Sequence, residues 1–212
     1  MRLLTSHMQL QLTNLGKRYN RHWIFRRLNA TVTADAPVAI TGANGSGKST
    51  LLQVIAGALE KSEGELALSL QGQPVAAEDY FRQVALCAPY LELIEELTLT
   101  EFLAFHEKFR PWLPGLDAAG LIELMQLGAA RHQQMRYFSS GMKQRVKLAQ
   151  AICSQSVLLL LDEPTSNLDL AGIAMYHQWM QQFAKGRLVL IASNDEQEIS
   201  FCQQRIAIAD FK

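Results

Sequence analysis

The sequence has no excess of charge of either sign. Its 212 residues include 20 lysines and arginines and 20 aspartates and glutamates, so the formal net charge at pH 7 is zero. Proteins whose main task is general binding of nucleic acids or anionic membranes usually carry a basic excess. We therefore expect no nucleic-acid partner and no function that depends on attraction to polyanions.

Cysteine is scarce and scattered. The three cysteines, Cys87, Cys153 and Cys202, form no CxxC pair and no Cys/His cluster with the spacing of metal ligands. Isolated cysteines of this kind are typical of buried thiols in a reducing cytosol. We expect neither a disulfide framework nor a cysteine-bound metal.

Long apolar runs are also absent. Runs such as Val157–Leu161 are far shorter than the roughly 20 residues that a helix needs to span a bilayer, and the first residues lack the apolar core of a secretory signal. We expect no direct membrane insertion, so any link to a membrane is made through a partner protein. Residues 1–7 precede a second methionine, Met8, and are interpreted as an N-terminal extension or a cloning remnant without function.

Strands and helices alternate along the rest of the chain. Residues 8–15 and 23–32 alternate apolar and polar side chains as half-buried strands do, which predicts a small antiparallel sheet at the start. Further strands are expected at 37–40, 65–70, 84–87, 157–161, 188–192 and 205–208, and helices at 51–59, 99–109, 118–127, 141–153, 170–183 and 196–201. This order predicts an α/β fold with a mostly parallel central sheet. We expect one domain over 8–212, with a helical insertion subdomain at about 90–155.

A glycine-rich loop follows the expected strand 37–40. Residues Gly42–Ser49 match the pattern G-x-x-x-x-G-K-S/T, which belongs between a strand and a helix, as it stands here. Glycines let the backbone curl so that successive N–H groups point inward, and the following helix start adds its positive dipole end. The pattern therefore predicts a cradle for the phosphates of ATP.

Several side chains of this loop have separate expected roles. The Lys48 ammonium would contact the β- and γ-phosphates, the Ser49 hydroxyl would bind Mg²⁺, and Thr50 would contact an α-phosphate oxygen. The residues expected to bind the nucleotide here are Gly42, Asn44, Gly45, Ser46, Gly47, Lys48, Ser49 and Thr50.

Two adjacent carboxylates end the apolar run Val157–Leu161. Asp162 and Glu163 must emerge at the edge of a sheet, because unpaired carboxylates are costly to bury. In the Walker B arrangement, the aspartate at the strand end holds Mg²⁺ through water, and the following glutamate polarises an attacking water. We expect Asp162 to hold Mg²⁺ and Glu163 to act as the catalytic base.

A third motif lies about 20 residues before that strand. Ser139-Ser140-Gly141-Met142 precedes a helix, where a serine is a natural N-cap. Taken in order, this motif, the loop Gly42–Thr50 and the segment Asp162–Asp169 resemble the nucleotide-binding domain of ABC transporters over nearly the whole chain.

The resemblance implies further site residues and a dimeric site. It identifies 138–142 with the signature loop L-S-G-G-Q, matched at Ser139 and Gly141, which in this family touches the γ-phosphate of a neighbouring subunit's ATP. It also implies that Tyr19 stacks on adenine and that residues 166–169 form the D-loop. Two such domains, identical or different, would sandwich two ATP molecules head to tail.

The sequence departs from the family pattern in two places. The family's switch histidine is expected after the strand 188–192, where Asn194 stands instead. An amide can donate a hydrogen bond to a γ-phosphate but cannot titrate or carry positive charge. The family's Q-loop glutamine is replaced by the segment Ala88-Pro89-Tyr90. We expect Asn194 to make hydrolysis slower than in relatives that carry the histidine. Without the glutamine, the side-chain link that the family uses between Mg²⁺, water and the transport partner is not expected in its usual form.

The expected function is ATP hydrolysis that powers a separate transmembrane transporter subunit, with this chain on the cytoplasmic face of the membrane. Glu163, Lys48 and Asn194 are the expected catalytic residues, and ATP and Mg²⁺ the expected ligands. Two alternatives stay open: a soluble, non-transport ABC ATPase, and a slow regulatory switch that binds ATP without efficient turnover.

Overall fold

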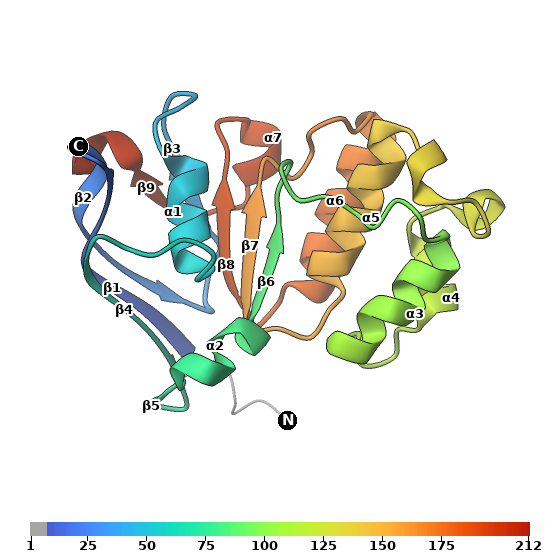
Figure 1. Ribbon diagram of the computed structural model, residues 1–212, viewed down its shortest axis with the longest axis horizontal. Coiled ribbons are helices and arrows are strands. Elements are labelled where there is room, and N and C mark those ends of the chain that lie inside the picture. Colours follow the sequence, from blue (N-terminus) through green and yellow to red (C-terminus); the bar gives the residue numbers. More distant parts are fainter. Residues whose placement is uncertain (1–7) are drawn as a thin grey trace. The chain divides into compact units, whose positions relative to one another are not determined.

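The computed structural model describes residues 8–212, which form two compact units (Figure 1). One unit comprises the described residues up to Leu86 together with Ser156–Glu163 and Lys185–Lys212, and the other comprises Cys87–Gln155 and Pro164–Ala184. The N-terminal extension expected at residues 1–7 lies outside the described residues.

The first unit contains a four-stranded antiparallel sheet in the order β2-β1-β4-β5. Its strands are β1 (Met8–Tyr19), β2 (His22–Thr33), β4 (Glu63–Leu70) and β5 (Gln73–Pro74). The antiparallel pairing of β1 with β2 confirms the expected hairpin, although both strands are longer than the alternation indicated. Register shifts between Leu12 and Arg18 explain this, because each irregularity breaks the period-2 pattern while the pairing continues.

The same unit contains a five-stranded sheet in the order β6-β7-β8-β3-β9. Its strands are β6 (Val84–Cys87), β7 (Leu158–Asp162), β8 (Leu188–Ala192), β3 (Val38–Thr41) and β9 (Gln204–Ala207). β3 pairs in parallel with β8 and β9, and β7 pairs in parallel with β8. Every residue of β7 and β8 is buried, as is typical of parallel strands covered on both faces.

Short helices accompany this sheet. They are α1 (Lys48–Ile55), α2 (Ala77–Gln83), α7 (Glu196–Ile199) and the 3₁₀ turn η3 (Ile208–Phe211). α1 lies against β7 and β8 (Figure 1), and its Leu51, Leu52 and Ile55 join the hydrophobic core between the sheets. The expected last strand, 205–208, is one residue out of place, because Ile208 already begins η3.

The second unit is helical. It contains α3 (Leu99–Phe109), α4 (Ala118–Leu124), η1 (Gly128–Ala130), η2 (Met135–Tyr137), α5 (Ser140–Ile152) and α6 (Leu170–Phe183). α3 begins with a capping box between Thr98 and Glu101, and its bounds agree with the expectation.

The end of α4 differs from the expected end at Leu127. The helix stops at Leu124, and Gln126 adopts a left-handed φ of 57°. The prediction took Gly128 as the residue that ends the helix, and the helix ends before it. Met125 and Leu127 are both buried beyond the helix end, so packing of these apolar side chains determines where the chain leaves the helix. No helix among residues 8–212 is long and apolar enough to cross a membrane.

Candidate functional site

The phosphate loop runs from the end of β3 to the start of α1, so the expected order of strand, loop and helix is confirmed. Gly42 has φ +149°, and a Cβ there would lie 2.7 Å from Oγ of Ser46. Gly47, the N-cap of α1, has φ +111°, and a Cβ there would lie 2.4 Å from Cγ2 of Ile24. Only glycine tolerates both the backbone conformation and the close approach, so these two positions set the curl of the loop.

Lys48 turns its ammonium group into this loop. Its Nζ donates hydrogen bonds to the carbonyl oxygens of Gly42, at 2.6 Å, and Ala43, at 3.4 Å, and the residue is only 6% exposed. A buried ammonium needs such partners. The charge therefore sits within the curl of the loop, where the G-x-x-x-x-G-K-S/T pattern places the β- and γ-phosphates.

Asn194 lies beside the loop, held by two hydrogen bonds to one residue. The N–H of Gly42 donates to Oδ1 of Asn194 at 3.0 Å, and Nδ2 of Asn194 donates to the carbonyl oxygen of Gly42 at 2.6 Å. From the sequence, Asn194 was expected to contact phosphate, and its pairing with Gly42 was not expected. Nothing in the local sequence around Gly42 indicates it.

Asp162 ends β7 with a carboxylate that is 2% exposed. Neither of its oxygens receives a hydrogen bond of ordinary geometry from the described part of the chain. Burial raises the pKa of Asp162 above its ordinary value, the Ser49 hydroxyl opposes that rise, and the charge of Glu163 adds to it. A buried carboxylate with free acceptor capacity near a hydroxyl is a donor set that suits Mg²⁺, which prefers oxygen ligands.

Glu163 follows Asp162 in a left-handed conformation with φ +44°. Its N–H donates to the carbonyl oxygen of Ala192 at 2.9 Å, which continues the pairing of β7 with β8 by one step. The turn that begins here brings the glutamate side chain to the exposed surface, whereas the Asp162 side chain stays buried. The two acids are thus adjacent in sequence but sit in opposite environments.

Tyr19 is the last residue of β1 and is 47% exposed. The Nζ of Lys17 lies 5.0 Å from the centre of the Tyr19 ring and donates to the carbonyl oxygen of Glu60 at 2.7 Å. The guanidinium of neighbouring Arg18 lies 5.4 Å from the ring of Trp23, its partner on β2. One face of the Tyr19 ring therefore has a cationic neighbour, a contact that sequence reasoning missed because the K-x-Y spacing is not distinctive.

The signature residues lie in the second unit, at the start of α5. Ser139 is the N-cap, and its hydroxyl accepts a hydrogen bond from the N–H of Met142 at 3.2 Å, as expected for a capping serine. A Cβ on Gly141 would lie 3.1 Å from the carbonyl oxygen of Asn167, so glycine lets the D-loop approach the helix. Residues 126, 127, 129, 130, 139–142, 145 and 167–169 line a cavity of about 560 Å³ here.

Two polar residues of α5 support this region and were not recognised from the sequence. Gln144 is buried and donates to the carbonyl oxygen of Pro164 at 2.7 Å. The guanidinium of Arg145 contacts the carbonyl oxygen of Met125 and a carboxylate oxygen of Asp169, both at 3.4 Å. Asp169 also caps α6 through the N–H of Gly172. The position of these two polar residues shortly after the signature motif can be read from the sequence, but their hydrogen-bond partners cannot.

The expected nucleotide residues thus divide between the two units. The phosphate loop, Asp162, Glu163, Asn194 and Tyr19 belong to the first unit, and Ser139 and Gly141 belong to the second. Within the first unit, the structure brings Asn194 and Lys48 to the same carbonyl group, that of Gly42. Within the second unit, it brings Gly141 next to the D-loop.

Comparison with known proteins identifies the family of this chain. A sequence profile described as ABC transporter matches residues 25–166. The cytochrome c biogenesis ATP-binding export protein CcmA of Brucella abortus is 33% identical over 189 residues, which are 88% of this chain and 85% of the relative.

Solved structures of similar fold include an ATP-binding subunit of an ABC transporter, with a TM-score of 0.79 and 28% identity over 94% of this chain and 85% of the other. They also include a dimeric ATP-binding cassette bound to ADP and Pi, with a TM-score of 0.79 and 21% identity over 94% of each chain. The chain therefore belongs to the ABC transporter family, as an ATP-binding domain with the α/β P-loop fold.

Proposed function

We propose that this protein hydrolyses ATP to power a separate transmembrane transporter subunit, from the cytoplasmic face of the membrane. The observation that carries the proposal is the buried Asp162 carboxylate without a hydrogen-bond partner of ordinary geometry, in the same unit as the curled loop that holds Lys48. An unsatisfied buried carboxylate is costly for stability alone, and a role in binding Mg-ATP explains why it is there.

In the proposed mechanism, the loop binds the phosphates before any chemistry occurs. Its backbone N–H groups and the start of α1 favour anions, and Lys48 exchanges its contacts with loop carbonyls for contacts with the β- and γ-phosphates. Ser49 and Asp162 would hold Mg²⁺, which when bound neutralises phosphate charge. Asn44, Gly45, Ser46 and Thr50 complete the set of proposed phosphate-binding residues.

Glu163 is the proposed base. Its exposed side chain would accept a hydrogen bond from a water molecule placed in line with the γ-phosphate, and would take a proton from it as the new P–O bond forms. Its left-handed backbone directs this acid away from the buried strand end, so that Asp162 and Glu163 can perform different tasks. Tyr19 would provide the stacking surface for adenine.

Ser139 and Gly141 would act on the ATP of a second ATP-binding chain. The cavity of about 560 Å³ between the signature loop and the D-loop offers a polar helix start to an incoming phosphate. We propose head-to-tail pairing with an identical or a different chain, closing on ATP and opening after hydrolysis. A solved ATP-binding cassette of the same fold, bound to ADP and Pi, is dimeric.

The transport role is tested by isolating the chain from detergent-solubilised membranes. An affinity-tagged chain should retain a multi-span membrane protein, and ATP hydrolysis by the complex should rise when the cargo of that protein is added. A Glu163→Gln chain should retain the same partner without hydrolysis, which separates assembly from catalysis. Recovery of ribosomes or DNA, with no membrane protein, would instead support the non-transport alternative.

A slow regulatory switch is the second candidate. It is favoured by Asn194, whose amide is engaged with Gly42, and by the absence of a glutamine in the segment Ala88-Pro89-Tyr90. A turnover below one ATP per minute in the complete complex, with cargo present, would favour this candidate over transport.

A further inference from the structure

The side chain of Asn194 continues the ladder between two parallel strands. β3 and β8 pair up to Ile40 and Ala192, and the N–H of Ser193 donates to the carbonyl oxygen of Ile40 at 3.1 Å. At the next step the main chain of β8 no longer follows β3, and the Asn194 amide takes the place of a peptide group opposite Gly42.

The chemistry of Gly42 determines how the amide is oriented. A backbone N–H can only donate and a carbonyl can only accept, so Oδ1 must face the N–H and Nδ2 must face the carbonyl oxygen. The oxygen of the amide and one of its N–H groups are therefore both used on a single loop residue. Gly42 also has a φ of +149°, a conformation that glycine adopts far more readily than other residues.

The carbonyl oxygen of Gly42 has a second donor. Nζ of Lys48 lies 2.6 Å from it, the same distance as Nδ2 of Asn194. A carbonyl oxygen has two lone pairs, and these two donors occupy both. The position of the ammonium that serves the phosphates is therefore coupled, through one oxygen, to the amide at the end of β8.

We propose that Asn194 is a positioning residue that braces the phosphate loop through Gly42, rather than a ligand of the γ-phosphate. The brace holds Gly42, and with it the start of the phosphate loop, in the conformation that receives the phosphates shared by ADP and ATP, so its loss should weaken both nucleotides alike. A histidine cannot replace it, because the two ring nitrogens of imidazole point away from each other and reach only one of the two Gly42 groups. The proposal rests on the proposed function only in taking the loop as the nucleotide site.

The test compares affinities for ADP and for a non-hydrolysable ATP analogue with Mg²⁺, by calorimetry at concentrations where the chain is a monomer. Asn194→Ala should weaken both by the same factor, about fivefold to tenfold for two lost hydrogen bonds. Asn194→Asp keeps an acceptor but loses the donor and adds negative charge, so its ADP affinity should fall at least as far. Gln197→Ala removes an exposed amide from nearby α7 and should leave both affinities unchanged.

Three results would overturn the proposal. One is a loss of affinity for the ATP analogue alone, which is what a γ-phosphate ligand predicts. Another is a lower melting temperature of Asn194→Ala with unchanged affinity for both nucleotides, which would make the amide a stabiliser of the fold only. The third is a faster turnover of Asn194→His with unchanged ADP affinity. If the parent chain binds neither nucleotide, the proposed function fails instead, and the two failures are distinguishable.

Discussion

Replacement of Asp162 by asparagine should stabilise the nucleotide-free protein while removing its response to Mg-ATP. The carboxylate is 2% exposed, and no residue among 8–212 gives either oxygen a hydrogen bond of ordinary geometry. A buried polar group without a partner costs about 1–3 kcal/mol, and a charged one costs more. Asparagine keeps the shape and a polar group but removes the charge, so we expect a gain of about 1–2 kcal/mol.

The expected shift in melting temperature follows from the size of the chain. For 150–250 residues, about 1 kcal/mol corresponds to about 2–4 °C, so Asp162→Asn should melt about 2–8 °C higher than the parent in EDTA without nucleotide. Asp35→Asn, at an exposed aspartate that accepts from Thr33, is the matched control and should change little. With Mg-ATP at about 100 times its Kd, the parent should gain about 2.7 kcal/mol and the variant much less.

The pH dependence has a defined sign. Because burial raises the folded-state pKa of Asp162, the folded protein binds more protons than the unfolded chain, and the penalty grows as pH rises above the ordinary value of 3.8. The difference between the variant and the parent should therefore shrink as the pH falls toward 3.8. A variant that melts below the parent without nucleotide would refute the reasoning, because it would mean that neighbours such as the Ser49 hydroxyl outweigh the cost of burying the carboxylate.

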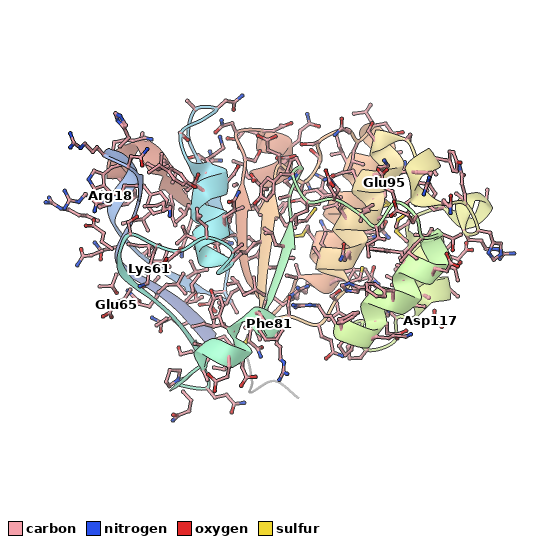
Figure 2. All side chains as sticks on the ribbon, in the orientation of Figure 1. Arg18, Lys61, Glu65, Phe81, Glu95 and Asp117 are labelled. Carbon is pink, nitrogen blue, oxygen red and sulfur yellow. The ribbon has the colours of Figure 1, made fainter. Side chains whose placement is uncertain are left out.

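Three further predictions concern other groups. Lys48→Ala should weaken ATP binding by at least about 100-fold in calorimetry, because it removes the one buried ammonium of the loop, whereas Lys61→Ala, at an exposed lysine (Figure 2), should not. Glu163→Gln should retain ATP binding and form an ATP-dependent dimer in gel filtration, with hydrolysis slowed at least about 100-fold; hydrolysis at the parent rate would assign the base elsewhere. Burial, aided by the charge of Arg110, lowers the pKa of His106 to about 4, so stability should fall as pH drops from about 6.5 toward 4, by about 1 kcal/mol after allowance for solvent screening. Urea unfolding should show this loss, and His106→Gln should lack it.

The secondary structure was largely predictable because its signals are local. β6, α3 and α6 have the bounds that the apolar patterns and caps indicated. The pattern failed where packing overrides local preference. α4 ends before Met125 because that side chain and Leu127 are buried outside the helix, so Gly128 does not mark its end. α2, which has no buried residue, presented no apolar face from which to predict it.

The candidate site shows the same contrast between local sequence signals and contacts that form only in the folded chain. The phosphate loop and the acid pair after β7 were recognisable because glycine, lysine and carboxylate groups stand at fixed short spacings that their chemistry requires. The partners of Gln144 and Arg145 were not, although both residues follow the signature motif directly. Their hydrogen bonds join α5 to Pro164 and Asp169, and no short spacing encodes such contacts.

The sequence by itself determined that this chain carries a phosphate loop, because the glycines and the lysine within Gly42–Thr50 set backbone freedom and charge locally. The order of this loop, the signature motif and the segment Asp162–Asp169 indicated the ABC transporter family. Only the tertiary structure decided what surrounds that loop. The amide of Asn194 meets Gly42 across 152 residues of chain, since the order of parallel strands places β8 beside β3. The same sheet buries the Asp162 carboxylate without a hydrogen-bond partner of ordinary geometry. Hydrogen bonding and desolvation at the site depend on which strands become neighbours, and that is a property of the whole fold.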